Sequence, residues 1–366
     1  MTFLFSDNLQ RCYFMNSRHV YSLDLLKLIL AYVIAFFHCD MTISPGPTVT
    51  VQVFFIISGF FLGKKYYSVS FPDPQCRYRA WDYTLDHVKK IYPHYFLSWA
   101  VFFLYLLARS ALEFLRSPSV ELLQSILRSF YNQIPDLFLL QSSHFFHDSI
   151  NYPLWQLSAL LISGYFIYAA LCHNERLSRE ILFPAAILMI QSLLVSGVGL
   201  WDNYGFFYLP LLRALSPLCL GVLTYYFSTT KYFAALRRHS LAFSLAGAVS
   251  LLCLFCYADR ANIFLISTPI LILSYMEPGS LINRIFDRPC FRGAGALSLA
   301  IYMNHSFVAR VLCALLLPRL AALGLQVAVW QKGLIYFFML TVYSIFTLWL
   351  INRWSRRAAA AQAPVC

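Results

Sequence analysis

Long apolar runs recur from one end of this chain to the other, with short polar segments between them. A helix of about 20 apolar residues is long enough to cross the hydrocarbon core of a bilayer. Within lipid, backbone polar groups must be paired inside their own segment, which favours helices. The sequence therefore predicts an all-α polytopic membrane protein of about ten transmembrane helices. We place them near residues 21–39, 50–63, 94–112, 152–172, 181–198, 206–227, 241–258, 261–276, 295–317 and 331–352.

The composition excludes a sizeable soluble domain. Hydrophobic residues make up 60% of the 366 residues and charged residues 12%, about half the charged share of a soluble domain. A net charge of +12 would also suit nucleic-acid binding, but the basic residues are scattered over short loops, so no nucleic-acid partner is expected. The ten cysteines show no disulfide or zinc-ribbon spacing. The first apolar run lacks a small-residue cleavage site, so we do not interpret it as a signal peptide.

The distribution of lysine and arginine predicts the orientation in the membrane. Nineteen of them fall on the termini and on alternate loops, and five on the opposite loops. Cytoplasmic loops carry such an excess of positive charge. We therefore expect a multi-pass protein of the cytoplasmic membrane with both termini cytoplasmic. The expected parts are an N-terminal tail over 1–20, a transmembrane domain over 21–353 and a C-terminal tail over 354–366.

The first run carries ionisable residues along one face. Lys27 and His38 are eleven residues apart, which is three helical turns and about 16 Å, and Asp24 can pair with Lys27 one turn away. A lysine and a histidine at the two membrane interfaces would explain this pattern without any function. Ionisable residues within a span also face protein interiors or wet cavities. Both interpretations stay open for this run taken alone.

Two later runs carry more buried polar residues. Arg213 is placed about two turns into its run, which is too deep for its charge to reach the interface easily. Ser298, Tyr302 and His305 follow at i, i+4 and i+7 and share one helix face. A lone Tyr–His pair would more often form an interhelical hydrogen bond. With His38 and Arg213 at comparable depth, the pattern favours a central polar cavity among the helices.

Two connections are also notable. Residues 64–93 are interpreted as a basic, aromatic cytoplasmic loop that binds either anionic lipid heads or the phosphates of a cytosolic cofactor. The external connection 113–151 contains a helical pattern over 120–131, which we expect to lie along the membrane surface. It also contains His144, His147 and Asp148, which we interpret as a solvated loop rather than a metal site. No metal is expected elsewhere.

Six motifs in order resemble the acyltransferase 3 family of membrane acyltransferases. The resemblance covers residue 21 to about 310, and each motif is weak by itself. The six together, with the expected topology, are specific. The matching residues are Asp24, Lys27 and His38; 53–60; 90–93; 154–158; Arg213 with Pro217 and Gly221; and Ser298, Tyr302 and His305.

The chain departs from the family pattern at three positions. Leu160 stands where many members carry a glutamate, so any role of that glutamate is in doubt here. His87 and Lys90 replace the arginines of the element before the third span. Lysine binds phosphate as a point charge, without the two-pronged grip of arginine.

The resemblance implies an enzyme that transfers an acyl group, acetyl in the first instance, from cytosolic acyl-CoA to a hydroxyl of a cell-envelope saccharide or lipid-linked glycan. A hydroxyl needs a base to attack, and we assign that role to His38. Arg213 or Tyr302 would stabilise the oxyanion, and His305 would orient His38, bind the acceptor or act as a second acid/base. The residues expected to bind the phosphates of coenzyme A are Lys27, Lys89 and Lys90. The residues expected to support the site are Asp24, Ser58, Trp155 and Ser298.

Two other functions fit the same composition. A buried His/Arg cavity would suit a proton-coupled transporter or a glycan translocase without acyl-transfer chemistry. Against this, the sequence shows no inverted repeat and no pair of broken helices. A purely structural membrane subunit is disfavoured because charged residues recur at several depths. Loss of acylation in a His38→Ala variant, with substrate accumulation unchanged, would separate enzyme from transporter.

Overall fold

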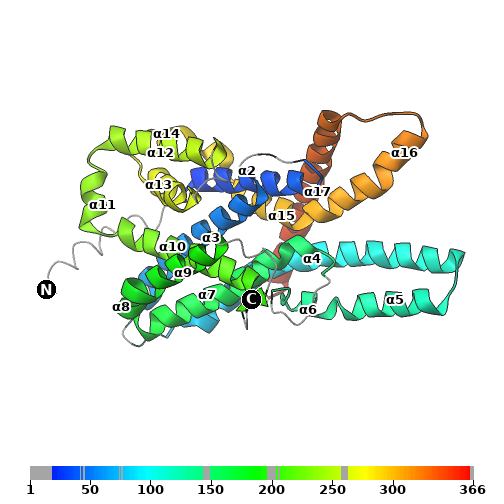
Figure 1. Ribbon diagram of the computed structural model, residues 1–366, viewed down its shortest axis with the longest axis horizontal. Helices are drawn as coiled ribbons and strands as arrows, with labels where there is room; N and C mark the ends of the chain where they lie inside the picture. Colours follow the sequence, from blue (N-terminus) through cyan, green and yellow to red (C-terminus); the bar gives the residue numbers. More distant parts are fainter. Residues whose placement is uncertain are drawn as a thin grey trace. The chain divides into compact units, whose positions relative to one another are not determined.

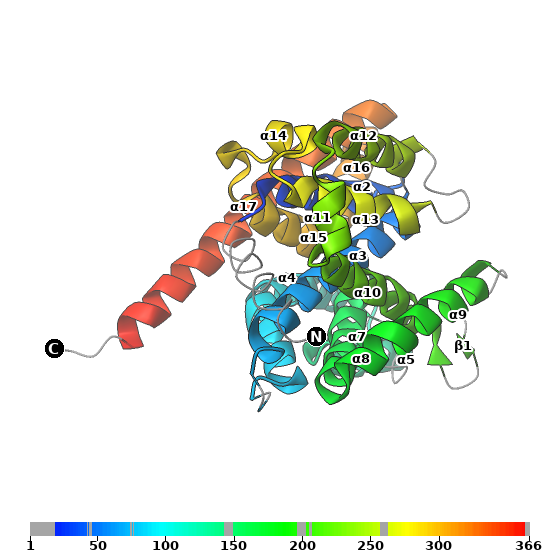
Figure 2. The same ribbon diagram turned by 90° about the vertical axis from the view of Figure 1, so that its left-hand side faces the viewer.

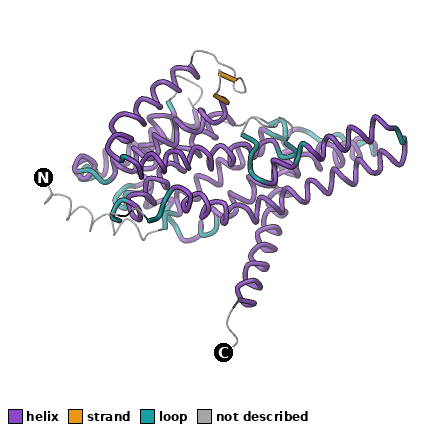
Figure 3. Tube along the Cα trace, turned by 90° about the horizontal axis from the view of Figure 1, so that it is seen from below, coloured by secondary structure: helices purple, strands orange, loops and turns teal. Residues whose placement is uncertain are grey.

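The computed structural model describes residues 19–41, 43, 46–73, 75, 77–142, 149–195, 203–204, 207–256 and 263–362. Nearly all of this part of the chain is helical, and Figure 3 shows the single short hairpin of strands in it. The α-helices are α2 (Tyr21–Phe37), α3 (Pro47–Lys65), α4 (Ala80–Arg116), α5 (Val120–Tyr131), α6 (Ile134–Leu137), α7 (Trp155–His173), α8 (Glu175–Leu177), α9 (Phe183–Val195), α10 (Leu209–Ser228), α11 (Lys231–Leu236), α12 (Ser240–Cys256), α13 (Phe264–Met276), α14 (Leu281–Phe286), α15 (Ala294–Val311), α16 (Leu317–Ala322) and α17 (Val329–Gln362).

Short segments of other geometry extend or join these helices. The π-helical turns are η1 (Tyr66–Ser70), η3 (Ser178–Leu182) and η5 (Leu312–Leu316), and the 3-10 turns are η2 (Tyr152–Leu154) and η4 (Pro289–Phe291). The strands are β1 (Asn203–Tyr204) and β2 (Phe207–Tyr208), which pair antiparallel.

The structure confirms an all-α membrane protein, and a helix occurs at each of the ten predicted runs. Among the described residues, six helical stretches are long and apolar enough to cross a membrane. They are Pro47–Ser70, Ala80–Arg116, Tyr152–His173, Leu209–Ser228, Pro289–Ala322 and Val329–Arg357. Two shorter apolar helices are Ser240–Cys256 and Phe264–Met276. The count of about ten spans and the central polar cavity therefore stay predictions.

The predicted loop over 64–93 is wrong over most of its length. Helical structure continues from α3 to the end of η1, and α4 already begins at Ala80. The Asp82 carboxylate caps that start by accepting a hydrogen bond of 2.9 Å from the Arg79 backbone N–H. Pro93, the last residue of the predicted loop, lies inside α4. Proline is tolerated within membrane helices because neighbouring groups pair the freed carbonyl.

The expected helix over 120–131 is confirmed with the same bounds. Ser119 caps it by accepting a hydrogen bond of 3.1 Å from the Leu122 N–H. None of its residues is buried, and its position along a membrane surface stays a prediction. At the other end of the chain, α17 runs through residue 353 to Gln362, so the expected C-terminal tail begins inside a helix.

The chain divides into two compact units, each built from three separate pieces. Unit 1 comprises Met1–Lys27, Ser44–His87 and Ala159–Gly295, and unit 2 comprises Leu28–Ile43, Val88–Ser158 and Ala296–Cys366. The helices α2, α4, α7 and α15 contribute residues to both units. Each unit is described separately below.

The core of unit 1 is the close packing of α3 against α10, which run side by side (Figure 1). Gly59 and Gly221 lie at this contact. A Cβ atom on Gly59 would overlap the Leu218 backbone, and one on Gly221 would overlap the backbone of Ile56 and Phe60. Small residues let membrane helices approach to backbone contact in this way. On another side of α10 packs α9, where Gln191 Nε2 donates to Ser216 Oγ over 3.0 Å (Figure 2).

Unit 2 contains the remainder of α4 with α5, which returns antiparallel beside it (Figure 1). The rings of Phe103 and Phe130 lie 5.1 Å apart between these two helices. The helix α17 packs against both α15 and the second half of α2. Asn304 Nδ2 donates to Thr347 Oγ1 over 2.9 Å, and the hydroxyls of Tyr32 and Thr341 lie 2.7 Å apart.

Candidate active site

The two predicted histidines lie in contact in unit 2. The ring centroids of His38 and His305 are 5.0 Å apart, with the ring planes tilted by 41°. His305 is completely buried on α15, whereas His38 is partly exposed. A reactant therefore meets His38 first and has His305 behind it.

Hydrogen bonding defines the tautomer of His305. Its Nδ1 lies 2.7 Å from the backbone carbonyl oxygen of Tyr302. A carbonyl oxygen only accepts hydrogen bonds, so Nδ1 carries the hydrogen and the lone pair of the neutral ring is on Nε2. The hydroxyl oxygen of Ser306 is 3.5 Å from that Nε2. Such a carbonyl contact also fixes the orientation of the ring.

The end of α2 sets the position of His38. The helix ends at Phe37, one residue before the histidine, although the sequence suggested a run to residue 39. Asp40 has a φ of 59°, the left-handed conformation that commonly ends helices. Its carboxylate lies 3.5 Å from Lys332 Nζ of α17. The turn is thus fastened to α17, and the His38 ring stands at the helix end rather than inside it.

Tyr302, proposed to stabilise the oxyanion, uses its hydroxyl for a structural hydrogen bond. Its side chain is buried, and its hydroxyl donates a hydrogen bond to the backbone carbonyl of Pro153. A phenol has one hydrogen to donate, so the hydrogen proposed for an oxyanion is already engaged. Tyr302 holds the segment before α7 against α15. Tyr336 of α17 holds the same turn of α15 by donating to the His305 carbonyl over 2.9 Å.

The two supporting residues of unit 2, Trp155 and Ser298, are both buried. Ser298 is buried on α15. Trp155 is buried at the start of α7, and its backbone carbonyl accepts a hydrogen bond of 2.7 Å from Ser142 Oγ. The neighbouring Ser158 accepts a hydrogen bond of 3.1 Å from the Ser142 N–H. These bonds fix the segment around Ser142 to the first turn of α7.

Asp24 and Lys27 lie in unit 1, in the first half of α2. The Lys27 ammonium is 3.4 Å from Asp24 Oδ1 and 4.7 Å above the ring of Phe61. Asp24 is buried and also lies 2.7 Å from His19 Nε2. The predicted Asp–Lys pair is therefore confirmed. Because its charge is balanced by Asp24, Lys27 fits a phosphate group less well than an unpaired lysine would.

Arg213 and Ser58 also belong to unit 1. Arg213 is buried, with 3% of its surface exposed, and it is the fifth residue of α10. It therefore lies about one turn from the helix start, because α10 begins three residues later than predicted. Ser58 is partly buried on α3. Lys89 and Lys90, by contrast, are exposed neighbours on α4 in unit 2 and fit the binding of an anion from solution.

The expected absence of a metal stays a prediction. No group of three or more His, Cys, Asp or Glu side chains suited to a metal occurs among the residues that the structure describes. His144, His147 and Asp148 lie outside those residues.

Unit 2 also contains a buried carboxylate that no sequence pattern indicated. Asp136 of α6 is 3% exposed, and its carboxylate accepts a hydrogen bond of 2.7 Å from Ser149 Oγ. Its backbone carbonyl accepts a hydrogen bond of 2.5 Å from the Tyr95 hydroxyl of α4. Such a residue in a connecting segment has no periodic pattern that would indicate burial. The only sequence signal is a carboxylate directly after Ile134 and Pro135.

Asp136→Asn should stabilise the protein at neutral pH. Burial raises the pKa of the Asp136 carboxyl to about 6 from an ordinary 3.8. The folded state thus binds a proton that the unfolded chain has released, so stability falls as pH rises from about 4 to 6 and stays low above that. Asparagine avoids this loss, and we expect a gain of up to about 3 kcal/mol at pH 7.

Thermal unfolding of the purified protein between pH 4 and 8 checks this. The melting temperature of the wild type should fall with rising pH, while that of the variant should fall less. Parallel curves for the two proteins would show that Asp136 does not titrate with this shift.

Sequence comparison places His38, Tyr302 and His305 within one known protein domain. A family model described as an acyltransferase domain matches residues 20–353. The chain belongs to the acyltransferase 3 family. It is thus a membrane acyltransferase, and the resemblance carried by the sequence motifs is confirmed. The searches of curated proteins and of solved structures found no match.

Membership of the acyltransferase 3 family gives the His38–His305 pair a chemical context. Acyl transfer to a hydroxyl requires removal of one proton, and an imidazole with a lone pair is suited to it. The pair brings two imidazole rings of this acyltransferase within 5.0 Å of each other. It is therefore the strongest candidate for the catalytic centre.

Proposed function

We propose that this acyltransferase moves an acetyl group from cytosolic acetyl-CoA to a hydroxyl of a cell-envelope saccharide or lipid-linked glycan. The observation that carries the proposal is the contact between His38 and His305, in a member of an acyltransferase family. Acetyl is the expected acyl group, and longer acyl-CoA molecules are further candidates as donor.

The reaction needs one base and no net change in protons. The acceptor oxygen attacks the thioester carbonyl carbon while a nitrogen of His38 takes the hydroxyl proton. The C–S bond then breaks, and the thiolate of coenzyme A takes the proton back from His38. His305 orients the His38 ring and stabilises its charged form through the lone pair on Nε2. Complete burial of His305 favours this supporting role over binding the acceptor or acting as a second acid/base.

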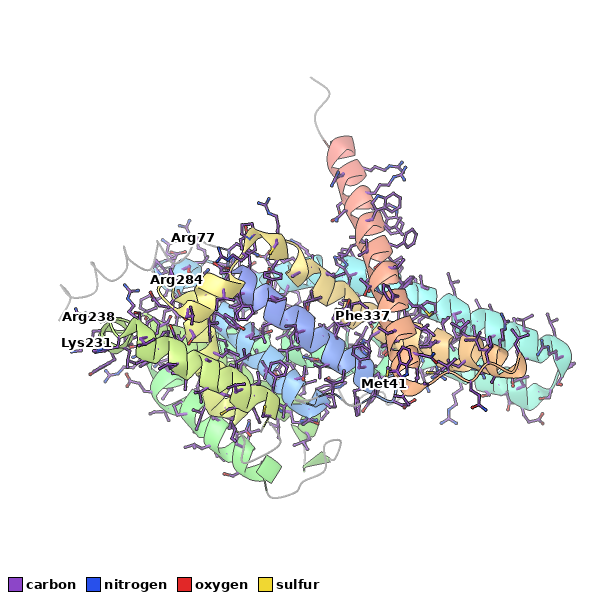
Figure 4. The ribbon with its side chains drawn as sticks, turned by 90° about the horizontal axis from the view of Figure 1, so that it is seen from above. Met41, Arg77, Lys231, Arg238, Arg284 and Phe337 are labelled. Carbon is purple, nitrogen blue, oxygen red and sulfur yellow. The ribbon has the colours of Figure 1, made fainter. Side chains whose placement is uncertain are left out.

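Basic residues support the binding of a phosphate-bearing donor. Lys89 and Lys90 are exposed on α4 of unit 2. In unit 1, Arg77, Lys231, Arg238 and Arg284 lie toward the same end of that unit (Figure 4). This gathering supports the positive-inside orientation, with both termini in the cytoplasm, where acyl-CoA is available. We therefore propose the cytoplasmic membrane as the location of the enzyme.

Acetyl transfer is tested with the purified full-length protein in lipid vesicles. Radiolabelled acetyl-CoA is supplied with and without a crude envelope glycan fraction. We expect release of coenzyme A that depends on the glycan, with label appearing in the glycan. A His38→Ala protein that remains folded should release none above background.

The same experiment tests the alternative of a transporter or glycan translocase. A transporter would move solute in the vesicles without releasing coenzyme A. The background release of coenzyme A would then be the same for the wild-type and His38→Ala proteins. If folded wild-type protein transfers no label with any acceptor or any acyl-CoA, the proposed function is wrong.

A further inference from the structure

Three buried carbonyl oxygens of amide side chains lack a hydrogen-bond partner in unit 2. They are Oε1 of Gln141, Oδ1 of Asn151 and Oε1 of Gln156. The residues are 7%, 2% and 7% exposed. Buried polar atoms of proteins are nearly always paired, so each exception calls for an explanation. The three residues, called the amide cluster below, are close in sequence, at positions 141, 151 and 156.

Hydrogen bonds from the amide nitrogens hold two of these side chains, Gln141 and Asn151, in place. Gln141 Nε2 donates to the Tyr95 hydroxyl over 2.5 Å. Asn151 Nδ2 donates to the backbone carbonyl of Met303 over 3.0 Å, and Ser98 Oγ donates to the same carbonyl over 2.6 Å. With the nitrogens engaged, the orientation of each amide is set and its oxygen is the end that remains available.

Asn151 and Pro153 lie against the turn of α15 that carries His305. Met303, which accepts from Asn151, is two residues before His305. Pro153, two residues after Asn151, accepts from the Tyr302 hydroxyl, and the Tyr302 carbonyl accepts from His305 Nδ1. Asn151 and Pro153 are thus held against the turn of α15 that precedes His305.

The chemistry of the cluster selects its ligand. Carbonyl oxygens only accept hydrogen bonds, so they suit a molecule with several donors. Saccharide hydroxyls are such donors. Phosphate groups are themselves acceptors, so this cluster does not suit the phosphates of coenzyme A.

We propose that Gln141, Asn151 and Gln156 bind hydroxyl groups of the saccharide acceptor and so set acceptor specificity. This inference rests on the proposed function and names the acceptor side of that site. The three oxygens are covered in the structure, so acceptor binding must part the side chains over them. Leu140, next to Gln141, and Tyr152, next to Asn151, are exposed.

Gln156→Met is the sharpest test because the Gln156 side chain makes no hydrogen bond within the described part of the chain. Methionine has nearly the same length and cannot accept a strong hydrogen bond. If the oxygen binds acceptor, KM for the glycan fraction, titrated by sugar concentration, should rise at least about 10-fold. KM for acetyl-CoA should not change. The melting temperature without glycan should stay equal or rise, because an unpaired buried atom has been removed.

Two further proteins make the outcome decisive. Gln156→Glu keeps an accepting oxygen and should restore KM for the glycan to within a few-fold of wild type. Gln191→Met in α9 removes another buried unpaired amide oxygen, one that belongs to unit 1, and it should leave both KM values unchanged. The glycan should also raise the melting temperature of wild type more than that of Gln156→Met.

The two proposals fail in different ways. Absence of glycan-dependent transfer by wild-type protein would contradict the proposed function. Normal transfer by Gln156→Met with unchanged KM for the glycan would contradict only the acceptor site. An equal rise of KM in Gln156→Met and Gln191→Met would also overturn it, since the effect would then be one of general packing.

Discussion

His38→Ala is expected to slow acyl transfer by about 100- to 10,000-fold, the usual contribution of a general base. The partly exposed ring at the end of α2 is the group that the acceptor hydroxyl can reach. KM for acetyl-CoA should change little, because alanine removes the base and no phosphate contact. Single-turnover release of coenzyme A from labelled acetyl-CoA measures the chemical step directly.

A matched set of histidine variants tests whether the pair acts as a unit. His305→Ala should lower the rate by a comparable factor, and the double variant should be no slower than the slower single one. His173→Ala, at the exposed end of α7, should retain full activity. Multiplicative losses in the double variant would mean that the two rings act independently, against the role given to their contact. A fully active His38→Ala protein would remove it from the mechanism.

Gly221→Ala is expected to destabilise the protein by at least about 3 kcal/mol, the upper part of the range for overpacking. The added methyl group would overlap the backbone of α3 at Ile56 and Phe60. Backbone atoms cannot rotate away as a side chain can, so the two helices must separate. Thermal unfolding of the protein in detergent, together with the yield of folded protein, measures the effect.

The control is another glycine inside a membrane helix. On Gly164 of α7, an added Cβ would lie 3.5 Å from the nearest atom, Cε1 of Tyr83, which is ordinary contact. Gly164→Ala should therefore be neutral or slightly stabilising, since alanine favours helices by about 1 kcal/mol. Equal melting temperatures for the Gly164→Ala and Gly221→Ala proteins would show that α3 and α10 are not in the close contact described.

Several parts of this fold could be predicted because they depend on local pattern. Apolar runs require helices in lipid, and the expected helix over 120–131 has the predicted bounds. The loop predicted over 64–93 is wrong because α4 begins at Ala80 and continues through Pro93. Whether a proline ends a helix depends on the groups that surround it, and these are brought there by other segments.

The candidate site was predictable in its residue types and only partly in its geometry. His38 and His305 were predicted because each is a polar residue on one face of an apolar helix. Their contact depends on the packing of α2 against α15 in unit 2. The buried Asp136 and the unpaired oxygen of Asn151 could not be foreseen. Their burial results from hydrogen bonds to residues far away in sequence, such as Met303.

The division of each unit into three separate pieces has a consequence for biosynthesis. Unit 2 takes its first piece from Leu28–Ile43 and its last from Ala296–Cys366. During synthesis His38 is made early, yet its partner ring leaves the ribosome some 267 residues later, the difference between positions 305 and 38. The nascent membrane protein must therefore keep an unfinished helix end available while most of unit 1 is completed. Premature termination before α15 would leave His38 in a chain that can never assemble the pair.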